Sequence, residues 1–131
     1  MKILVDADAL IALAKEDDVN HAKAVKIAQS LQKETLYVTP LTIPEAVTVV
    51  SYRLSQKTAS QFLKEARLRK LVELSLTSQV CFLADEIFLK QERRKTSWID
   101  CLNVAMIKIH HLDGIFSFDK FYAKLGLKQF C

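Results

Sequence analysis

The order of short apolar runs and longer amphipathic segments is the feature that most constrains this chain's fold. The segments between the apolar runs repeat their apolar residues every three or four positions, which is the period of an amphipathic helix. Strands that alternate with helices are connected by right-handed crossovers and form a mainly parallel sheet. The runs read as strands are Lys2–Asp6, Thr35–Pro40, Leu71–Leu76 and Ile115–Asp119. We therefore expect an α/β fold, a three-layer α/β/α sandwich with a mainly parallel central sheet.

The helical segments and the scarcity of breakers predict one domain. Only two glycines and two prolines occur among the 131 residues, and no linker or internal repeat is visible. A short edge strand is expected within Leu127–Cys131, and a single domain is expected over residues 1–131. The expected helices are Ala9–Lys15, Val19–Lys33, Ile43–Leu54, Lys57–Lys70, Ser78–Arg94, Ser97–His111 and Lys120–Lys124.

Composition and the N-terminus indicate a soluble protein of the cell interior. Half of the residues are hydrophobic and 26% are charged, which is the balance of an ordinary globular domain. No uncharged stretch approaches the ~18 residues of a membrane span. Asp6 and Asp8 interrupt the only early apolar run, unlike a signal peptide. The three cysteines are odd in number and widely spaced, so reduced thiols are expected. We expect a cytoplasmic location without membrane association.

Four acidic residues occupy equivalent places in this pattern. Asp6 and Asp119 end expected strands, Glu45 begins the helix after the second strand, and Asp100 opens the helix that leads to the fourth. The carboxyl ends of parallel strands meet at one edge of a sheet, so these acids should converge. Gathered carboxylates repel one another unless a cation neutralises them. Oxygen ligands without histidine or thiolate favour Mg²⁺ or Mn²⁺.

Each acid also has a simpler explanation as a helix cap. Asp6 or Asp8 could cap the helix expected from Ala9, and Asp119 could cap the last short helix. The segments Thr42–Glu45 and Ser97–Asp100 both have the spacing of a capping box, in which the acid reaches back to the first amide. Capping and metal binding are compatible, because a metal ligand can lie at a helix N-terminus.

The acidic motifs together resemble those of a known nuclease family. The segments "LVDADALIAL", "TIPEAV", "TSWIDCLNVAM" and "IFSFD" follow one another in the order found in PIN-domain nucleases. More narrowly, they resemble the small VapC-type toxins of toxin–antitoxin modules, from Lys2 to about Leu127. The resemblance implies a PIN-like fold and Mg²⁺- or Mn²⁺-dependent endoribonuclease cleavage of RNA. It further implies a cognate antitoxin and a homodimer, and the many apolar residues of the segment Val47–Leu63 are compatible with the latter.

The resemblance also assigns roles to individual residues. Asp6, Asp100 and Asp119 would hold the metal directly or through water, and Glu45, the fourth acid of the metal and catalytic set, would orient or deprotonate the attacking water. Ser117 matches a hydroxyl residue that often lies two positions before the last acid, where it could orient a ligand.

Asp8 and a basic cluster are further candidates. Such proteins usually have a small polar residue at position 8, so Asp8 is a departure that could strengthen or spoil metal binding. Arg93, Arg94 and Lys95 lie just before Asp100 and could contact RNA phosphates, although a solvated helix end explains them slightly better.

Two other functions remain open at this point. A strand followed by Asp-x-Asp also opens the haloacid-dehalogenase-like phosphatases, in which Asp6 would be the nucleophile and Asp8 its acid–base partner. That chemistry needs a further acidic pair, and "FSFDKF" supplies one acid only. The second alternative is an inactive PIN-fold module that binds RNA or a protein partner.

Overall fold

The central sheet contains five strands, and every neighbouring pair is parallel. The computed structural model describes residues 1–131. The sheet order is β3-β2-β1-β4-β5, so β1 lies at the centre between β2 and β4. Ile3 of β1 pairs with Leu36 of β2 on one side and with Gly114 of β4 on the other. The strands are β1 (Lys2–Val5), β2 (Thr35–Val38), β3 (Val72–Glu73), β4 (Gly114–Phe116) and β5 (Gln129–Phe130).

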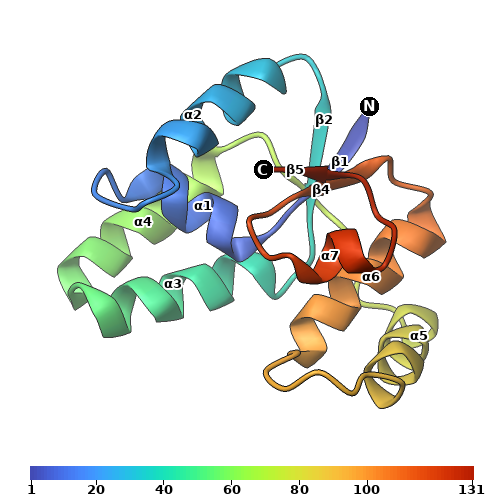
Figure 1. Cartoon of the computed structure of the whole chain (residues 1–131). Coiled ribbons are helices and arrows are strands. Elements are labelled where there is room, and N and C mark those ends of the chain that lie inside the picture. The colour runs from blue at the N-terminus through green and yellow to red at the C-terminus, as the bar shows by residue number, and fades with distance from the viewer.

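Helices cover both faces of this sheet, which confirms the expected three-layer α/β/α sandwich. One face carries α1 (Ala7–Ala14), α2 (His21–Ser30), α3 (Thr42–Arg53) and α4 (Gln56–Leu68). The other face carries α5 (Ser78–Leu89), α6 (Trp98–His110) and α7 (Phe121–Lys124). Figure 1 shows the two groups of helices on opposite sides of the strands.

The alternation of side chains along β1 divides the core between these two groups. Ile3 and Val5 pack with the helices α1 to α4, whereas Leu4 packs with α6 and α7. All three side chains are almost fully buried. Successive side chains of a strand point to opposite faces, so a central strand covered on both sides must be apolar throughout. This explains the uninterrupted "ILV" before Asp6.

The strand order brings the ends of β1 and β4 together. The chain builds β1, β2 and β3 in one direction and then returns to place β4 on the other side of β1. The amide of Asp6 donates a hydrogen bond to the carbonyl of Phe116 (3.0 Å), so the segments that follow the two strands leave the sheet side by side. This is the switch point at which ligand sites of open parallel sheets form.

Several element boundaries differ from the prediction. Helix α1 begins at Ala7 and not at Ala9, with Asp6 as its N-cap. Helix α5 ends at Leu89 and not at Arg94, because "KQERRK" (90–95) offers no apolar side chain to bury and Gln91 Nε2 donates to the carbonyl of Ile87 (2.9 Å). Strands β3 and β4 are shorter than expected. The segment Ser117–Asp119 is therefore a loop beyond the sheet.

One of the two expected capping boxes is wrong. Ser97 and Asp100 form theirs, with each side chain bonded to the other residue's amide (3.0 and 3.1 Å). Thr42 does not cap α3, because the helix starts at Thr42 itself and Leu41 is the N-cap. The Thr42 hydroxyl instead accepts a hydrogen bond from the amide of Thr39 (3.1 Å). Glu45 therefore has no capping partner.

The cysteines and the helix lengths complete the description. Cys81, Cys101 and Cys131 are all free thiols, as the odd count predicted. Burial raises the pKa of the Cys101 thiol to about 11, which makes it an unreactive core residue. No helix combines the length and the apolar character that a membrane crossing requires.

Candidate active site

The acids singled out in the sequence line one cavity at the carboxyl ends of β1 and β4. The cavity has a volume of about 210 Å³ and is called the acidic cavity below. Five of its nine lining residues are carboxylic acids, and Arg53 is the only base among them. The acids are Asp6, Asp8, Glu45, Asp100 and Asp119.

Asp6 is the most buried acid and is held by four hydrogen bonds. Its Oδ1 accepts from the Ala7 amide (2.8 Å) and from Asn103 Nδ2 (3.1 Å). Its Oδ2 accepts from the hydroxyls of Ser117 (2.9 Å) and Tyr122 (3.1 Å). Only 6% of the residue is exposed, so these donors replace the water that a carboxylate normally requires. Asp6 thus acts as the helix cap that the sequence suggested and also lines the cavity.

A buried polar pair on α6 and α7 links Asp6 to Asp100. The amide of Asn103 donates to Asp6 and to the Tyr122 hydroxyl (2.9 Å), and that hydroxyl lies 3.3 Å from Asp100 Oδ1. Asn103 and Tyr122 are almost fully buried. Neither residue was among the candidates expected from the sequence. Asn103 interrupts an apolar run three residues after Asp100, and Tyr122 lies three residues after Asp119, which is the only local signal they give.

Glu45 enters the cavity from the other group of helices. Val49 and Arg53 follow it at intervals of four residues on α3, and all three side chains line the acidic cavity. The Arg53 side chain is therefore brought to the acids by helical periodicity alone. Arg53 was not among the residues expected at the site, although its spacing of eight residues from Glu45 on a helix is a signal that could have indicated it.

The loop after β4 is held in place by Asp8. Oδ2 of Asp8 accepts from the amide of Phe118 (2.9 Å) and lies 3.3 Å from the Ser117 hydroxyl. Oδ1 of Asp8 is buried without a hydrogen-bond partner. Ser117 accepts in turn from the amide of Asp119 (3.1 Å), and Asp119 accepts from the amide of Phe121 (2.9 Å).

Burial and mutual repulsion raise the pKa values of the acids. Burial, followed by the charges of Asp6 and Asp100, raises the pKa of Glu45 to about 7. Burial and the charge of Asp6 raise the pKa of Asp8 to about 7 as well. The pKa values of Asp6 and Asp100 are also raised, chiefly by burial, although their hydrogen bonds oppose the rise. The cavity therefore favours any group that neutralises negative charge.

The five carboxylates suit a divalent cation by their chemistry, although their oxygens are not arranged around a common centre. Five carboxylates and an orphaned buried oxygen on Asp8 form a hard, anionic environment that suits Mg²⁺ or Mn²⁺. No group of three acidic, histidine or cysteine side chains is arranged closely enough to hold a metal ion. In this arrangement, hydrogen bonds from amides and hydroxyls hold the side chains of Asp6, Asp100 and Asp119.

The basic residues before Asp100 lie in the loop between α5 and α6. Nη1 of Arg93 lies 3.7 Å from Asp119 Oδ1, so Arg93 reaches the rim of the acidic cavity. Arg94 and Lys95 are exposed in the same loop, and Lys95 has a positive φ of 67°. The structure thus brings Arg93 to the acids.

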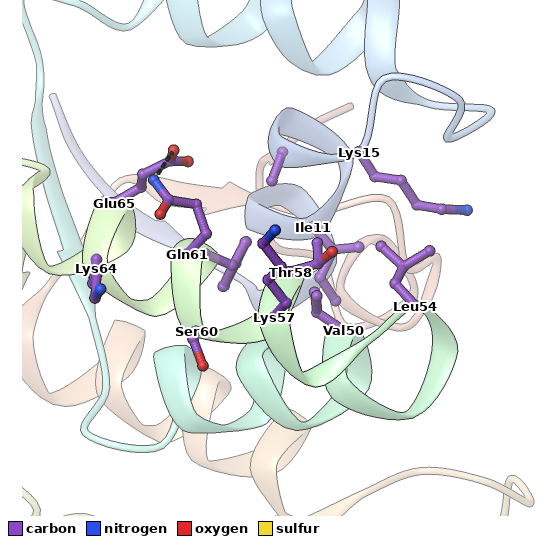
Figure 2. Close-up of a pocket in the computed structure, with 12 residues that line it drawn as sticks. Ile11, Lys15, Val50, Leu54, Lys57, Thr58, Ser60, Gln61, Lys64 and Glu65 are labelled. Atoms are coloured by element: carbon purple, nitrogen blue, oxygen red, sulfur yellow. Dashed lines mark hydrogen bonds between the residues drawn. The ribbon is translucent and has the colours of Figure 1, made fainter.

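A larger groove adjoins the acidic cavity between α1, α3 and α4. It has a volume of about 710 Å³, and Ile11 of α1 lines both cavities. Apolar side chains including Ile11, Val50 and Phe62 contribute to the groove. Three lysines, Lys15, Lys57 and Lys64, line it together with a single acid, Glu65. Figure 2 shows these three helices contributing the side chains that line the groove.

Comparisons with known proteins agree with this arrangement. The family model of the PIN domain matches residues 3–127. A search of curated protein sequences found no match. Among solved structures, the VapC20 toxin of Mycobacterium tuberculosis, described as cleaving the sarcin–ricin loop, is 17% identical, with a TM-score of 0.85 and 96% of each chain covered.

Two further solved structures are similar in fold. VapBC2 of Rickettsia felis, bound to a DNA fragment from its promoter, is 12% identical, with a TM-score of 0.74 and all of both chains covered. A toxin–antitoxin complex of Klebsiella pneumoniae is 13% identical, with a TM-score of 0.61, and the match covers 91% of this chain and 88% of the other. The TM-scores show a shared fold, and at identities this low the likeness shows the fold alone.

Proposed function

Because this chain belongs to the PIN-domain family, we propose that it is a metal-dependent endoribonuclease, the toxin of a type II toxin–antitoxin pair. The observation that carries the proposal is the acidic cavity, which gathers five carboxylates from five separate positions in the chain. The family match supports a nuclease and gives no support to the phosphatase alternative. The proposed nuclease domain covers residues 1–131, of which the family model spans 3–127.

The proposed roles follow from the position of each acid. Asp6, Asp100 and Asp119 would hold Mg²⁺ or Mn²⁺, with Glu45 beside them. When bound, such a cation polarises a phosphate oxygen and lowers the pKa of water. Glu45 is suited to accept a proton from the attacking water, since its side chain lines the acidic cavity and makes no hydrogen bond within the protein.

The basic side chains would contact the RNA backbone. Arg53 and Arg93 lie at the acidic cavity, where either guanidinium can neutralise a phosphate that approaches five acids. Arg94 and Lys95 extend this charge along the loop. Backbone contacts of this kind fix the position of the RNA without reading its sequence.

The test is cleavage of structured RNA by the purified protein with and without Mn²⁺. The substrates should include a sarcin–ricin loop fragment, because a similar fold acts on that RNA. Glu45→Gln should reduce the cleavage rate by a factor of about 10²–10⁴, the usual contribution of a general base. Glu86→Gln, on the exposed surface of α5, removes the same charge and should leave the rate unchanged.

Two other outcomes would count against the proposed nuclease. Cleavage that survives Glu45→Gln and Asp6→Asn would come from a contaminating nuclease. Binding of RNA without any cleavage would favour the inactive PIN-fold module over the enzyme.

The groove between α1, α3 and α4 is the proposed docking site of an antitoxin. Similar folds occur in toxin–antitoxin complexes. An apolar lining with three lysines and one acid complements an amphipathic segment that carries acidic side chains. Because Ile11 lines both cavities, a segment in the groove would reach the edge of the acidic cavity and could block RNA.

Charge reversal at the groove tests this docking site. Lys57→Glu should weaken binding of the protein encoded beside this chain by about tenfold or more, because like charges would then face each other. Lys108→Glu, on the exposed side of α6, is the matched control and should have no effect. Equal binding by the wild type and Lys57→Glu, measured by calorimetry, would place the antitoxin elsewhere.

A further inference from the structure

The hydrogen bonds of Asp6 leave no acceptor site for a cation. A carboxylate offers about four lone-pair sites, and the four donors of Asp6 occupy two on each oxygen. A cation can therefore coordinate Asp6 only after one donor has moved away. The question is which donor is able to move.

Two of the four donors are fixed. The amide of Ala7 belongs to the first turn of α1 and cannot rotate independently. The side-chain amide of Asn103 uses one hydrogen for Asp6 and the other for the Tyr122 hydroxyl, so its rotation would break two buried bonds. The two hydroxyl donors differ, because a hydroxyl hydrogen rotates about its C–O bond without any movement of heavy atoms.

Each hydroxyl has a second carboxylate within reach. The Ser117 hydroxyl lies 3.3 Å from Asp8 Oδ2, and the Tyr122 hydroxyl lies 3.3 Å from Asp100 Oδ1. Asp100 is itself a proposed cation ligand, so a hydrogen bond from Tyr122 would occupy a lone pair of Asp100 that the cation needs. Asp8 is not one of the proposed cation ligands. Ser117 is fully buried and its oxygen accepts from the Asp119 amide, so its hydrogen is directed to Asp6 or to Asp8.

We propose that Asp8 is a positioning residue that accepts the Ser117 hydroxyl hydrogen when a cation binds, so that Asp6 Oδ2 gains a free lone pair. The inference rests on the proposed function, in which Asp6 is a cation ligand. The Phe118 amide holds Asp8 Oδ2 beside Ser117 in readiness (2.9 Å). The unusual acid at position 8 thereby has a specific role, which is neither direct coordination nor simple negative charge.

A double-mutant cycle on Mn²⁺ affinity separates these three roles. Calorimetric titration of the full chain gives the affinity without reference to cleavage. Asp8→Ala should weaken Mn²⁺ binding by about tenfold, the size of one charge-assisted hydrogen bond. In the Ser117→Ala background the competing hydroxyl is gone, and Asp8→Ala should then cost less than about twofold.

Direct coordination by Asp8, or a purely electrostatic effect, would give equal losses in both backgrounds and would overturn the proposal. Asp8→Asn provides a second test that leaves Ser117 intact. Its side-chain oxygen can still accept the hydroxyl, so its affinity should stay within about threefold of the wild type. An Asp8→Asn protein that binds as poorly as Asp8→Ala would also overturn the proposal.

Glu16→Gln is the charge control, because it removes one acid from the exposed turn after α1 and should not change the affinity. Failure of the proposed function gives a different result. A wild-type protein that binds no Mn²⁺ would exclude the cation site itself, whereas a wild type that binds Mn²⁺ with additive mutations would exclude only the role of Asp8.

Discussion

At the scale of single residues, the cost of gathering negative charge dominates the site. Asp6 is stabilised in its buried position by four donors, whereas no hydrogen bond within the protein relieves Glu45. Burial, together with repulsion from the neighbouring acids, raises the pKa values of Glu45 and Asp8 to about 7, and the same two effects favour the binding of a cation. Gathering these acids therefore lowers the stability of the fold, but it also creates a site that favours a cation.

The first prediction concerns the pH dependence of stability without divalent ions. An acid whose pKa is raised in the folded state binds its proton more tightly there than in the unfolded chain, so its ionisation destabilises the fold. The thermal midpoint in a chelator should therefore fall as the pH rises from about 4.5, the ordinary value for Glu45, through about 7. Circular dichroism would measure it.

Two comparisons check the cause. Glu45→Gln should make the midpoint less dependent on pH, because one titrating group is removed. Excess Mn²⁺ should raise the midpoint at about pH 8 by binding only the folded state. A midpoint that rises between about pH 5 and pH 8 without ions would contradict the assignment of raised pKa values.

At the scale of elements, two similar sequence patterns have different outcomes. Ser97 and Asp100 form a capping box that fixes the start of α6. Thr42 and Glu45 have the same spacing, yet Thr42 binds Thr39 and the helix begins one residue earlier than the pattern required. Glu45 is therefore free of the helix start and faces the acidic cavity. Because the expected capping box does not form, the side chain of Glu45 has no hydrogen-bond partner within the protein.

The second prediction tests the cap that did form. Ser97→Ala should lower the free energy of unfolding by about 1 kcal/mol, since the Asp100 amide loses its acceptor. It should also weaken Mn²⁺ binding, because fraying of the first turn would displace the Ser97 backbone amide that holds Asp100 Oδ2 (3.1 Å). Urea denaturation and calorimetry give the two quantities.

Thr77→Ala is the matched control for this cap. Thr77 caps α5 through the Val80 amide (3.2 Å), away from the acidic cavity. Its loss should cost a similar free energy of unfolding without any change in Mn²⁺ affinity. Equal effects of both variants on Mn²⁺ binding would show that only general stability matters.

At the scale of the whole molecule, the surface carries apolar side chains that its own core does not use. Tyr52 on α3 is 88% exposed, and Phe82 and Leu89 on α5 are 65% and 82% exposed. Phe82 and Leu89 are seven residues apart and so share one face of α5. Exposed apolar side chains that share a face are typical of an interface with another protein.

The third prediction is therefore a homodimer. Sedimentation at micromolar concentration should give a mass of twice 14.9 kDa. Replacement of Phe82 and Leu89 by Glu should give a monomer, if α5 forms the contact. Val19→Ser, at an isolated residue that is 95% exposed, is the control and should remain a dimer. A wild-type monomer at all concentrations would remove this prediction.

Sequence pattern and tertiary structure contributed different parts of this description. The periods of the apolar residues and the acids at segment ends were sufficient to predict the layers, the parallel sheet and the positions of Asp6, Glu45, Asp100 and Asp119 near its edge. These features follow from backbone geometry, which repeats every two residues in a strand and every 3.6 in a helix. They were therefore determined by the sequence alone.

The contacts that make the site specific were decided only by the tertiary structure. Asn103 and Tyr122 reach Asp6 across 97 and 116 residues, and Ser117 reaches Asp8 across 109. Such contacts depend on the register that pairs Ile3 with Gly114, and no local period encodes that register.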